Sequence, residues 1–321
     1  MRIAVTGSIA TDHLMTFPGR FADQLIADKL HKVSLSFLVT DLEIRRGGVA
    51  ANIAFGLGCL GLDPLLVGTV GSDFADYRLW LEEHGVDTSL VRESTKFHTA
   101  RFVGTTDADL NQIASFYPGA MSEDVSLDIS TLSSVADLVL IGAGDPSAMT
   151  SLTKQCRESQ MPFAADTSQQ LAVLAGEQIR DLVTGAAYLF SNEYEASLTE
   201  HKTGWSATDV ITRVGVRVTT LGANGTRVDR RGEAPVHIGP VKDVHPADPT
   251  GTGDAFRAGF LAGVAWGLSF ERSAQLGNLL AVHALETTGP QDYTLKPAVL
   301  LARCAASYGQ EAADELGKHI N

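Results

Sequence analysis

The chain has 321 residues, of which 44% are apolar and 20% are charged, and its formal net charge is −13. This length suits two domains, or one large α/β domain with an insertion, and the composition excludes a disordered chain. Acidic residues outnumber basic ones without long runs of one sign, which excludes the basic face of a nucleic-acid-binding protein. Any phosphate site must therefore be built locally, from amides, a few cations and a metal.

The three cysteines, Cys59, Cys156 and Cys304, predict a reduced protein. They are far apart and odd in number, so they form neither a disulfide framework nor a zinc spacing. The N-terminus lacks the basic segment and long apolar core of a signal peptide, and no apolar run approaches the roughly 18 residues of a transmembrane helix. We therefore expect a soluble, cytoplasmic protein with no membrane partner.

Residues 2–7 form an apolar run that predicts a first strand, which ends at Gly7 and Ser8 and is followed by Asp12. Ligands of open α/β sheets gather at the carboxyl ends of strands, so Ser8 and Asp12 are candidates for binding. The alternative is that they only begin a loop. A dinucleotide site is not expected, because the Gly-x-Gly-x-x-Gly fingerprint is absent there.

Two further segments predict a small sheet beside the main one. Residues 33–39 alternate apolar and polar side chains, as a half-buried strand does. Residues 97–104 and 111–116 flank a turn-rich segment, which predicts a β-hairpin. These strands break the alternation of strands and helices found elsewhere. We therefore expect a single domain, 1–321, whose small sheet comes from insertions at approximately 12–46 and 96–118.

The rest of the chain predicts an α/β fold, a doubly wound, mostly parallel sheet flanked by helices. Continuous apolar runs are typical of strands buried on both faces, and they occur at 64–70, 137–142, 162–166 and 186–190. Helical patterns lie between them, at 74–84 and 147–157, and this alternation is typical of a parallel sheet. Two more helical patterns, 272–286 and 296–316, are expected to pack the core.

A helical pattern within 45–61 opens with Gly47 and Gly48. Asn52 lies one turn into this helix, where its amide either faces a ligand or is simply solvated. The run 186–190 is followed by Asn192 and Glu195, a spacing that matches a helix capping box. The same two residues at the end of a strand could also hold Mg²⁺ through water.

A strand at 216–222 is followed by an Asn-Gly turn at 223–225 and a second strand at 226–230. Thr220 and Gly222 could contact a nucleotide through backbone and hydroxyl groups, although most Asn-Gly turns are only turns.

Residues 248–260 combine two glycines with a carboxylate at the start of a helical pattern. Gly251 and Gly253 leave their amides unshielded, and a glycine-rich turn that enters a helix is an anion site. The amides of Gly251, Thr252 and Gly253 would hold that anion. Asp254 either caps the helix or accepts the proton of a hydroxyl that attacks a phosphate. Arg257 either adds a cation near the phosphates or lies on the surface.

Together these motifs resemble the PfkB or ribokinase-like family of carbohydrate and nucleoside kinases. The resemblance spans essentially the whole chain and rests on three signatures: Gly47-Gly48 with Asn52, Asn192-x-x-Glu195, and DPTGTGDAF at 248–256. The chain departs from the family at Thr252, where a smaller or apolar residue is usual, but both glycines and Asp254 are kept. The resemblance implies a ribokinase-like fold with a small β-sheet lid over the substrate.

Within the family, the stretches 1–15, 31–39, 112–121, 164–171 and 248–260 resemble adenosine kinases of the actinobacterial type. This similarity implies transfer of the γ-phosphoryl group of ATP to the 5′-hydroxyl of adenosine, which gives AMP for purine salvage. The residues that it implies for the nucleoside are Asp12, Gly48 and Asn52 at the ribose, with Ser8 and Ser36 nearby, Phe102 and Phe116 on the two faces of the purine, and Gln169 and Gln170 along it.

The resemblance implies ATP and Mg²⁺ as cofactors. The nucleotide would contact Asn192, Thr220 and Gly222, and Asn192 and Glu195 would hold Mg²⁺ through water. A monovalent cation, K⁺, near Asp248 is left open. The alternatives are a PfkB kinase for ribose, a hexose or a broader set of nucleosides, and a binding protein that senses a nucleoside without catalysis. Exposed strand edges on the lid favour a homodimer.

Overall fold

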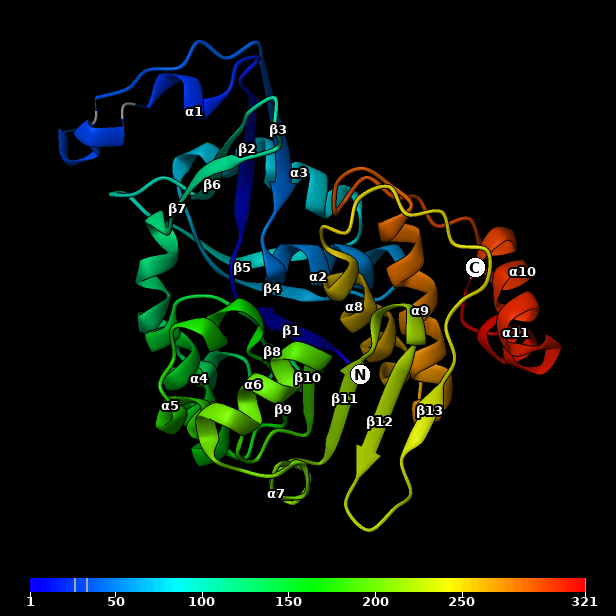
Figure 1. Cartoon of the computed structure of the whole chain (residues 1–321). Helices are drawn as coiled ribbons and strands as arrows, with labels where there is room; N and C mark the ends of the chain where they lie inside the picture. Colours follow the sequence, from blue (N-terminus) through cyan, green and yellow to red (C-terminus); the bar gives the residue numbers. More distant parts are fainter. Residues whose placement is uncertain (26, 33, 321) are drawn as a thin grey trace.

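In the part of the chain that the computed structural model describes, residues 1–25, 27–32 and 34–320, nine strands form one central sheet (Figure 1). Its strands, in spatial order, are β13 (Val236–Ile238), β12 (Thr226–Arg230), β11 (Val216–Thr220), β10 (Tyr188–Asn192), β9 (Phe163–Asp166), β8 (Leu138–Ile141), β1 (Ile3–Thr6), β4 (Leu65–Val70) and β5 (Asp87–Glu93). Neighbours pair in parallel from β5 to β11, and only β12 and β13 are antiparallel. The predicted mostly parallel sheet is confirmed.

Helices cover both faces of this sheet. Successive residues of a strand point to opposite faces, and in β8 Leu138 and Leu140 pack into one core cluster while Val139 and Ile141 pack into the other. The helices are α1 (Phe21–Gln24), α2 (Val49–Cys59), α3 (Ala75–Glu83), α4 (Pro146–Ser159), α5 (Gly176–Val183), α6 (Glu193–Thr203), α7 (Ala207–Ile211), α8 (Thr252–Ala265), α9 (Phe270–Leu285), α10 (Pro297–Tyr308) and α11 (Gln310–Leu316). Burial on both faces explains why the strands read as continuous apolar runs.

The central strand β1 is where the winding of the sheet changes direction. The chain passes from β1 to β4 and β5 on one side, and then from β8 through β9, β10 and β11 on the other. In open α/β sheets a crevice forms outside the carboxyl ends of the strands at such a point. The segment after β1, which begins with Gly7 and Ser8, enters this crevice.

A second, four-stranded sheet stands over the carboxyl end of β1, at the top of Figure 1. Its strands, in spatial order, are β3 (Asp41–Gly47), β2 (Ala10–Thr16), β6 (Ala100–Thr106) and β7 (Gln112–Tyr117). The hairpin β6–β7 lies where the sequence predicts it, within a few residues. We call this unit the small sheet.

The strand predicted at 33–39 is wrong. Residues 34–39 lie in no strand, Val33 lies outside the described residues, and the strand that pairs with β2 is β3. One apolar residue of this segment, Phe37, packs into an aromatic cluster instead, since the centre of its ring lies 4.9 Å from those of both Phe17 and Phe21.

The helix predicted after Gly47 and Gly48 is confirmed, since β3 ends at Gly47 and α2 begins at Val49, with a φ of 95° at Gly48 between them. One helix boundary differs from the prediction. The single helix predicted at 296–316 is two helices, α10 and α11, separated by Gly309 with a φ of 94°. Among the described residues, none of these helices is both long enough and apolar enough to cross a membrane.

Candidate active site

A cleft of about 730 Å³ lies between the small sheet and the carboxyl edge of the main sheet. Because parallel strands end at one edge, segments far apart in the sequence meet there. Of the residues predicted to bind or act on a substrate, those that line the cleft are Ser8, Asp12, Gly48, Asn52, Phe102, Phe116, Gln169, Gln170, Gly251 and Asp254.

Asp254 lies in the first turn of α8, at the floor of this cleft. Burial raises the pKa of its carboxyl group to about 7, although the charge of Arg257 and a hydrogen bond from Asn52 lower it. No side-chain hydrogen bond caps the start of α8, whose N-cap residue is Gly251. The capping alternative for Asp254 is therefore wrong. A carboxyl group with this pKa can accept a proton near neutral pH.

Asn52 holds Asp254 in position. Its Nδ2 donates to Asp254 Oδ2 (2.8 Å), and its own Oδ1 accepts from Gln291 Nε2 (2.8 Å). The same Gln291 nitrogen contacts the Tyr77 hydroxyl group (2.5 Å), which in turn donates to the carbonyl oxygen of Gly47 (2.9 Å). Asn52 is 6% exposed, so the alternative of a solvated side chain is wrong. The network fixes which end of the Asn52 amide faces the carboxylate.

The loop before α8 takes a conformation that requires glycine at one position. Gly251 has a φ of 73°, and a Cβ atom there would lie 2.4 Å from Cβ of Pro290. The first N–H groups of a helix have no partner within it. The amide of Thr252 already donates to the carbonyl oxygen of Pro249 (3.2 Å). Its hydroxyl group is buried and has no partner among the described residues.

A buried ion pair lies beneath this loop. Arg257 Nη2 donates to Asp166 Oδ1 (2.6 Å) and Arg257 Nε lies 2.6 Å from Oδ2. Both residues are buried, so the surface alternative for Arg257 is wrong. Arg257 Nη2 also lies 3.9 Å from Glu195 Oε2. The guanidinium group is thus a positive charge placed among Asp166, Glu195 and Asp254.

The Gly47–Gly48 pair lets α2 begin against the end of β1. A Cβ atom on Gly48 would lie 2.5 Å from the carbonyl oxygen of Ser8, and one on Gly47 would lie 3.0 Å from Asp12 Oδ2. Ser8 Oγ accepts from the amide of Val49 (2.9 Å), so this hydroxyl group caps α2. Burial raises the pKa of Asp12, and the charge of Arg45 opposes the shift.

One wall of the cleft is aromatic. Phe102 in β6 and Phe116 in β7 are direct partners in the small sheet, and both side chains point into the cleft. Phe116 is 50% exposed. Since directly opposite residues project from one face of a sheet, the two rings stand side by side on this wall. On the main body, Gln170 Nε2 donates to the carbonyl oxygen of Gly144 (2.8 Å), and both residues line the cleft.

The residues predicted for a nucleotide lie further along the same edge of the main sheet. Asn192 and Thr220 end β10 and β11 and are direct partners, and Gly222 follows with a φ of 57°. Asn192 Oδ1 accepts from the amide of Glu195, and Glu195 Oε2 accepts from that of Asn192 (2.8 Å each). The capping box is confirmed. Among the described residues, no three His, Cys, Asp or Glu side chains are grouped to hold a metal ion.

Three other predicted residues are not among the described residues that line the cleft: Ser36, which is exposed, and Thr252 and Gly253, which begin α8. Four residues that the motifs do not single out belong to the site: Tyr77, Arg45, Asp166 and Gln291. Asp166 ends a buried strand, which is a usable signal for a functional carboxylate. Gln291 follows a Gly-Pro turn, and nothing in that pattern indicates burial.

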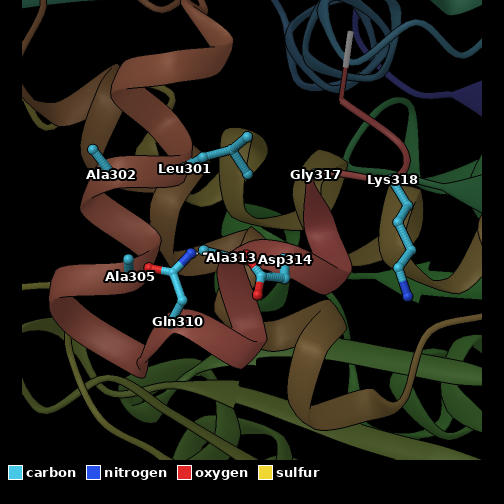
Figure 2. A pocket seen from close by; sticks show the side chains of 8 residues that line it. All are labelled: Leu301, Ala302, Ala305, Gln310, Ala313, Asp314, Gly317 and Lys318. Atoms are coloured by element: carbon cyan, nitrogen blue, oxygen red, sulfur yellow. Dashed lines mark hydrogen bonds between the residues drawn. The ribbon is translucent and has the colours of Figure 1, made fainter.

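A second hollow lies between α10 and α11 (Figure 2). It is smaller, about 420 Å³, and its lining includes Leu301, Ala302, Ala305 and Ala313. Its one carboxylate, Asp314, accepts a hydrogen bond from Gln310 (2.7 Å). None of the predicted motifs contributes to it, so the chemistry belongs to the larger cleft.

Known proteins are similar to this chain over nearly its whole length. The sequence profile described as pfkB family carbohydrate kinase matches residues 9–297. The structure of the nucleoside kinase of Burkholderia thailandensis in complex with inosine is 33% identical, with a TM-score of 0.83 over 96% of this chain and 98% of that one. The nucleoside kinase of Methanocaldococcus jannaschii, described as an archaeal member of the ribokinase family, is 25% identical, with a TM-score of 0.84 over 95% and 98%. The ribokinase of Bacillus subtilis is 26% identical over 90% of this chain and 94% of its own. These likenesses confirm the ribokinase-like fold.

Proposed function

Because this chain belongs to the pfkB family of carbohydrate kinases, we propose that it transfers the γ-phosphoryl group of ATP to a hydroxyl group of a nucleoside. The observation that carries the proposal is the pair of phenylalanine rings that lines one cleft together with Asp12 and Asp254. Flat aromatic faces suit a base, and short polar groups suit the ribose hydroxyls. Two similar proteins are named nucleoside kinases, one of them in complex with inosine, and this supports the choice.

Adenosine is the nucleoside that we propose, with its 5′-hydroxyl as the acceptor and AMP, a product of purine salvage, as the result. In this arrangement Asp12, Gly48 and Asn52 hold the ribose, with Ser8 nearby, and Gln169 and Gln170 lie along the base. Phe102 and Phe116 contact the purine. We further propose that the small sheet acts as a lid, made by insertions into a single domain, which excludes water from the reaction.

Asp254 accepts the proton of the attacking hydroxyl group in the proposed reaction. A positioned base typically contributes about 10²–10⁴-fold to a rate. The amides of Gly251, Thr252 and Gly253 stabilise the charge that develops on the phosphate, and Thr252 must release its contact with Pro249 to take part. The unpartnered hydroxyl group of Thr252 supports an anion at this place.

At the nucleotide end, Asn192, Thr220 and Gly222 contact ATP. Both side chains of the capping box are engaged with backbone amides, which fits a metal bound by phosphate oxygens and water rather than by the protein. Mg²⁺ would neutralise phosphate charge there, and Glu195 would orient its water ligands. We also expect a cytoplasmic location, where the three free thiols stay reduced.

ADP release in parallel assays with adenosine, inosine, guanosine, ribose and fructose tests the proposal. We expect turnover with the nucleosides, with adenosine best, and little with the free sugars. A preference for ribose or fructose would establish the sugar kinase alternative. Nucleoside binding in calorimetry without ADP release from any acceptor would establish the sensor alternative.

The aromatic wall gives a sharp prediction. Phe102→Ala should raise the KM for the nucleoside by about 5–150-fold, which corresponds to the roughly 1–3 kcal/mol that one stacked base contributes. The KM for ATP should stay the same, because the ring lies away from the predicted nucleotide residues. Steady-state kinetics in each substrate measure both values. Ile113→Ala, on the opposite face of the small sheet, is the matched control, and equal effects on both substrates would reject the stacking role.

The pKa of Asp254, raised to about 7, predicts the pH dependence. Since the base must be ionised, kcat/KM for the nucleoside should fall about tenfold per pH unit below pH 7 and level off above it. Initial rates at saturating ATP between about pH 5.5 and 9 measure this profile. The residual activity of Asp254→Asn is the control, and it should lack the same titration. A flat profile would argue against Asp254 as the base.

We propose, finally, that the outer face of the small sheet forms a homodimer. Leu42 and Ile44 in β3 and Ile113 and Tyr117 in β7 lie on that face, toward its two edges, and are 40–59% exposed. Large apolar side chains exposed on one face of a sheet favour an interface. Ile44→Lys should shift the protein to a monomer in sedimentation equilibrium. A wild-type protein that sediments as a monomer would contradict this proposal.

A further inference from the structure

An arginine of the small sheet reaches the loop that carries the proposed base. Arg45 lies in β3, directly opposite Asp12 in β2, and lines the cleft. Its Nη1 donates to Asp248 Oδ2 (2.9 Å), across 203 residues of sequence. The side chains of Arg45 and Asp248 are only 17% and 14% exposed. This pair is therefore better shielded from solvent than an ordinary surface ion pair.

The guanidinium group is fixed in its orientation from the other side. Arg45 Nε and Nη2 donate to the two carboxylate oxygens of Glu43 (2.7 and 2.8 Å). A bidentate contact of this kind holds the plane of a guanidinium group and directs its remaining nitrogen. Glu43, Arg45 and Asp248 thus form a row of paired charged side chains that runs from the edge strand of the small sheet to the main body.

On the main body, Asp248 connects two loops through hydrogen bonds. Its Oδ1 accepts from the amide of Thr250 (2.9 Å), inside the glycine loop that leads to Asp254. Its Oδ2 accepts from Arg45 and also from the amide of Gly289 (3.1 Å), two residues before the Gln291 that orients Asn52. A shift of Asp248 would move both the anion loop and the support of the base.

We propose that Arg45 is a positioning residue that holds the loop 248–254 in place from the small sheet, and that its guanidinium group replaces a monovalent cation at Asp248. The inference rests on the proposed function. This contact couples closure of the small sheet to alignment of the anion loop, because Arg45 is part of the small sheet and also binds the loop. Arg45 itself need not touch the reacting atoms.

The residues around Asp248 do not fit the K⁺ that the family resemblance leaves open. Such cations are bound by oxygen ligands, whereas the Asp248 carboxylate accepts three N–H donors. A guanidinium group at 2.9 Å also repels a second cation at the same carboxylate. In this protein the guanidinium group of Arg45 supplies the positive charge at Asp248.

Four measurements on Arg45→Ala test this inference. Its kcat should fall by about 10–10²-fold, as small misplacements of catalytic groups do, while the KM for the nucleoside changes much less. Guanidinium chloride at low millimolar concentration should restore part of the lost turnover, and urea, its uncharged counterpart, should not. Hydrogen exchange should become faster in peptides that cover 248–254 and 286–292. The wild-type rate should be the same in KCl and in tetramethylammonium chloride at equal ionic strength.

Arg46→Ala is the matched control. This neighbouring arginine stacks on the ring of Trp80 at 4.2 Å and does not line the cleft, so kcat and exchange in both loops should stay as in the wild type. Arg45→Lys keeps the charge and should retain more turnover than Arg45→Ala.

Three results would overturn the inference: strong activation of the wild type by K⁺, unchanged exchange in both loops of Arg45→Ala, or an effect of Arg45→Ala confined to the KM for the nucleoside. Hydrogen exchange needs no turnover. A wild-type protein without kinase activity would therefore reject the proposed function while the loop measurement still tests Arg45.

Discussion

Asp254→Asn should lower kcat by at least about 10²-fold while nucleoside binding stays within a few-fold. The substitution removes the proton acceptor but keeps the shape of the side chain, and the amide oxygen of the new residue can still accept the hydrogen bond from Asn52. Single-turnover kinetics at saturating ATP, together with calorimetric titration of the nucleoside, separate the two effects.

Near-normal turnover of this variant would reject Asp254 as the base. A loss of nucleoside binding equal to the loss of turnover would instead indicate that Asp254 mainly binds the substrate. The melting temperature is the control for folding, and it should hardly change. Burial disfavours the ionised carboxylate of Asp254 in the protein without substrate, so the substitution does not remove a charge that stabilises the fold.

Arg257→Met should destabilise the protein by about 3–5 kcal/mol, the usual cost of removing one partner from a buried ion pair. Asp166 is 1% exposed and would be left with an uncompensated charge beneath the glycine loop. Burial already raises the pKa of Asp166, and Arg257 is the charge that lowers it. Urea unfolding, followed by circular dichroism, measures the change in free energy.

The double variant Arg257→Met with Asp166→Asn provides the control. Because it removes both charges together, it should recover much of the lost stability. If the double variant is as unstable as Arg257→Met alone, the loss comes from packing rather than from the unpaired charge. Arg217→Met, which breaks a pair with the partly exposed Glu200, should cost less.

The main sheet could be predicted from the sequence because burial on both faces leaves a local mark. Runs such as 137–142 are apolar throughout, and the helices between them follow a helical period. The small sheet was harder to place. Alternation at 33–39 is a local pattern that does not require a strand: Phe37 packs into an aromatic cluster, and the strand that pairs with β2 is β3.

The candidate site also has features that a local sequence pattern predicts and features that it does not. The turn at Gly251 was predictable, since glycine is the residue that most readily takes the positive φ found there. The surroundings of Asp254 were not predictable. Asn52 lies 202 residues from it in the sequence, and Gln291 lies 239 residues from Asn52. No local pattern encodes such contacts.

The sequence by itself therefore determined the fold class and was enough to propose the anion loop and the base, because these depend on backbone sterics and on periodicity over a few residues. Only the tertiary structure decided what surrounds the base. It partly buried Asp254 in the cleft, placed Arg257 and Asp166 next to it, and brought Arg45 from the small sheet to Asp248. Desolvation and charge pairing arise when distant segments pack together, so they belong to the fold and not to any one stretch of the chain.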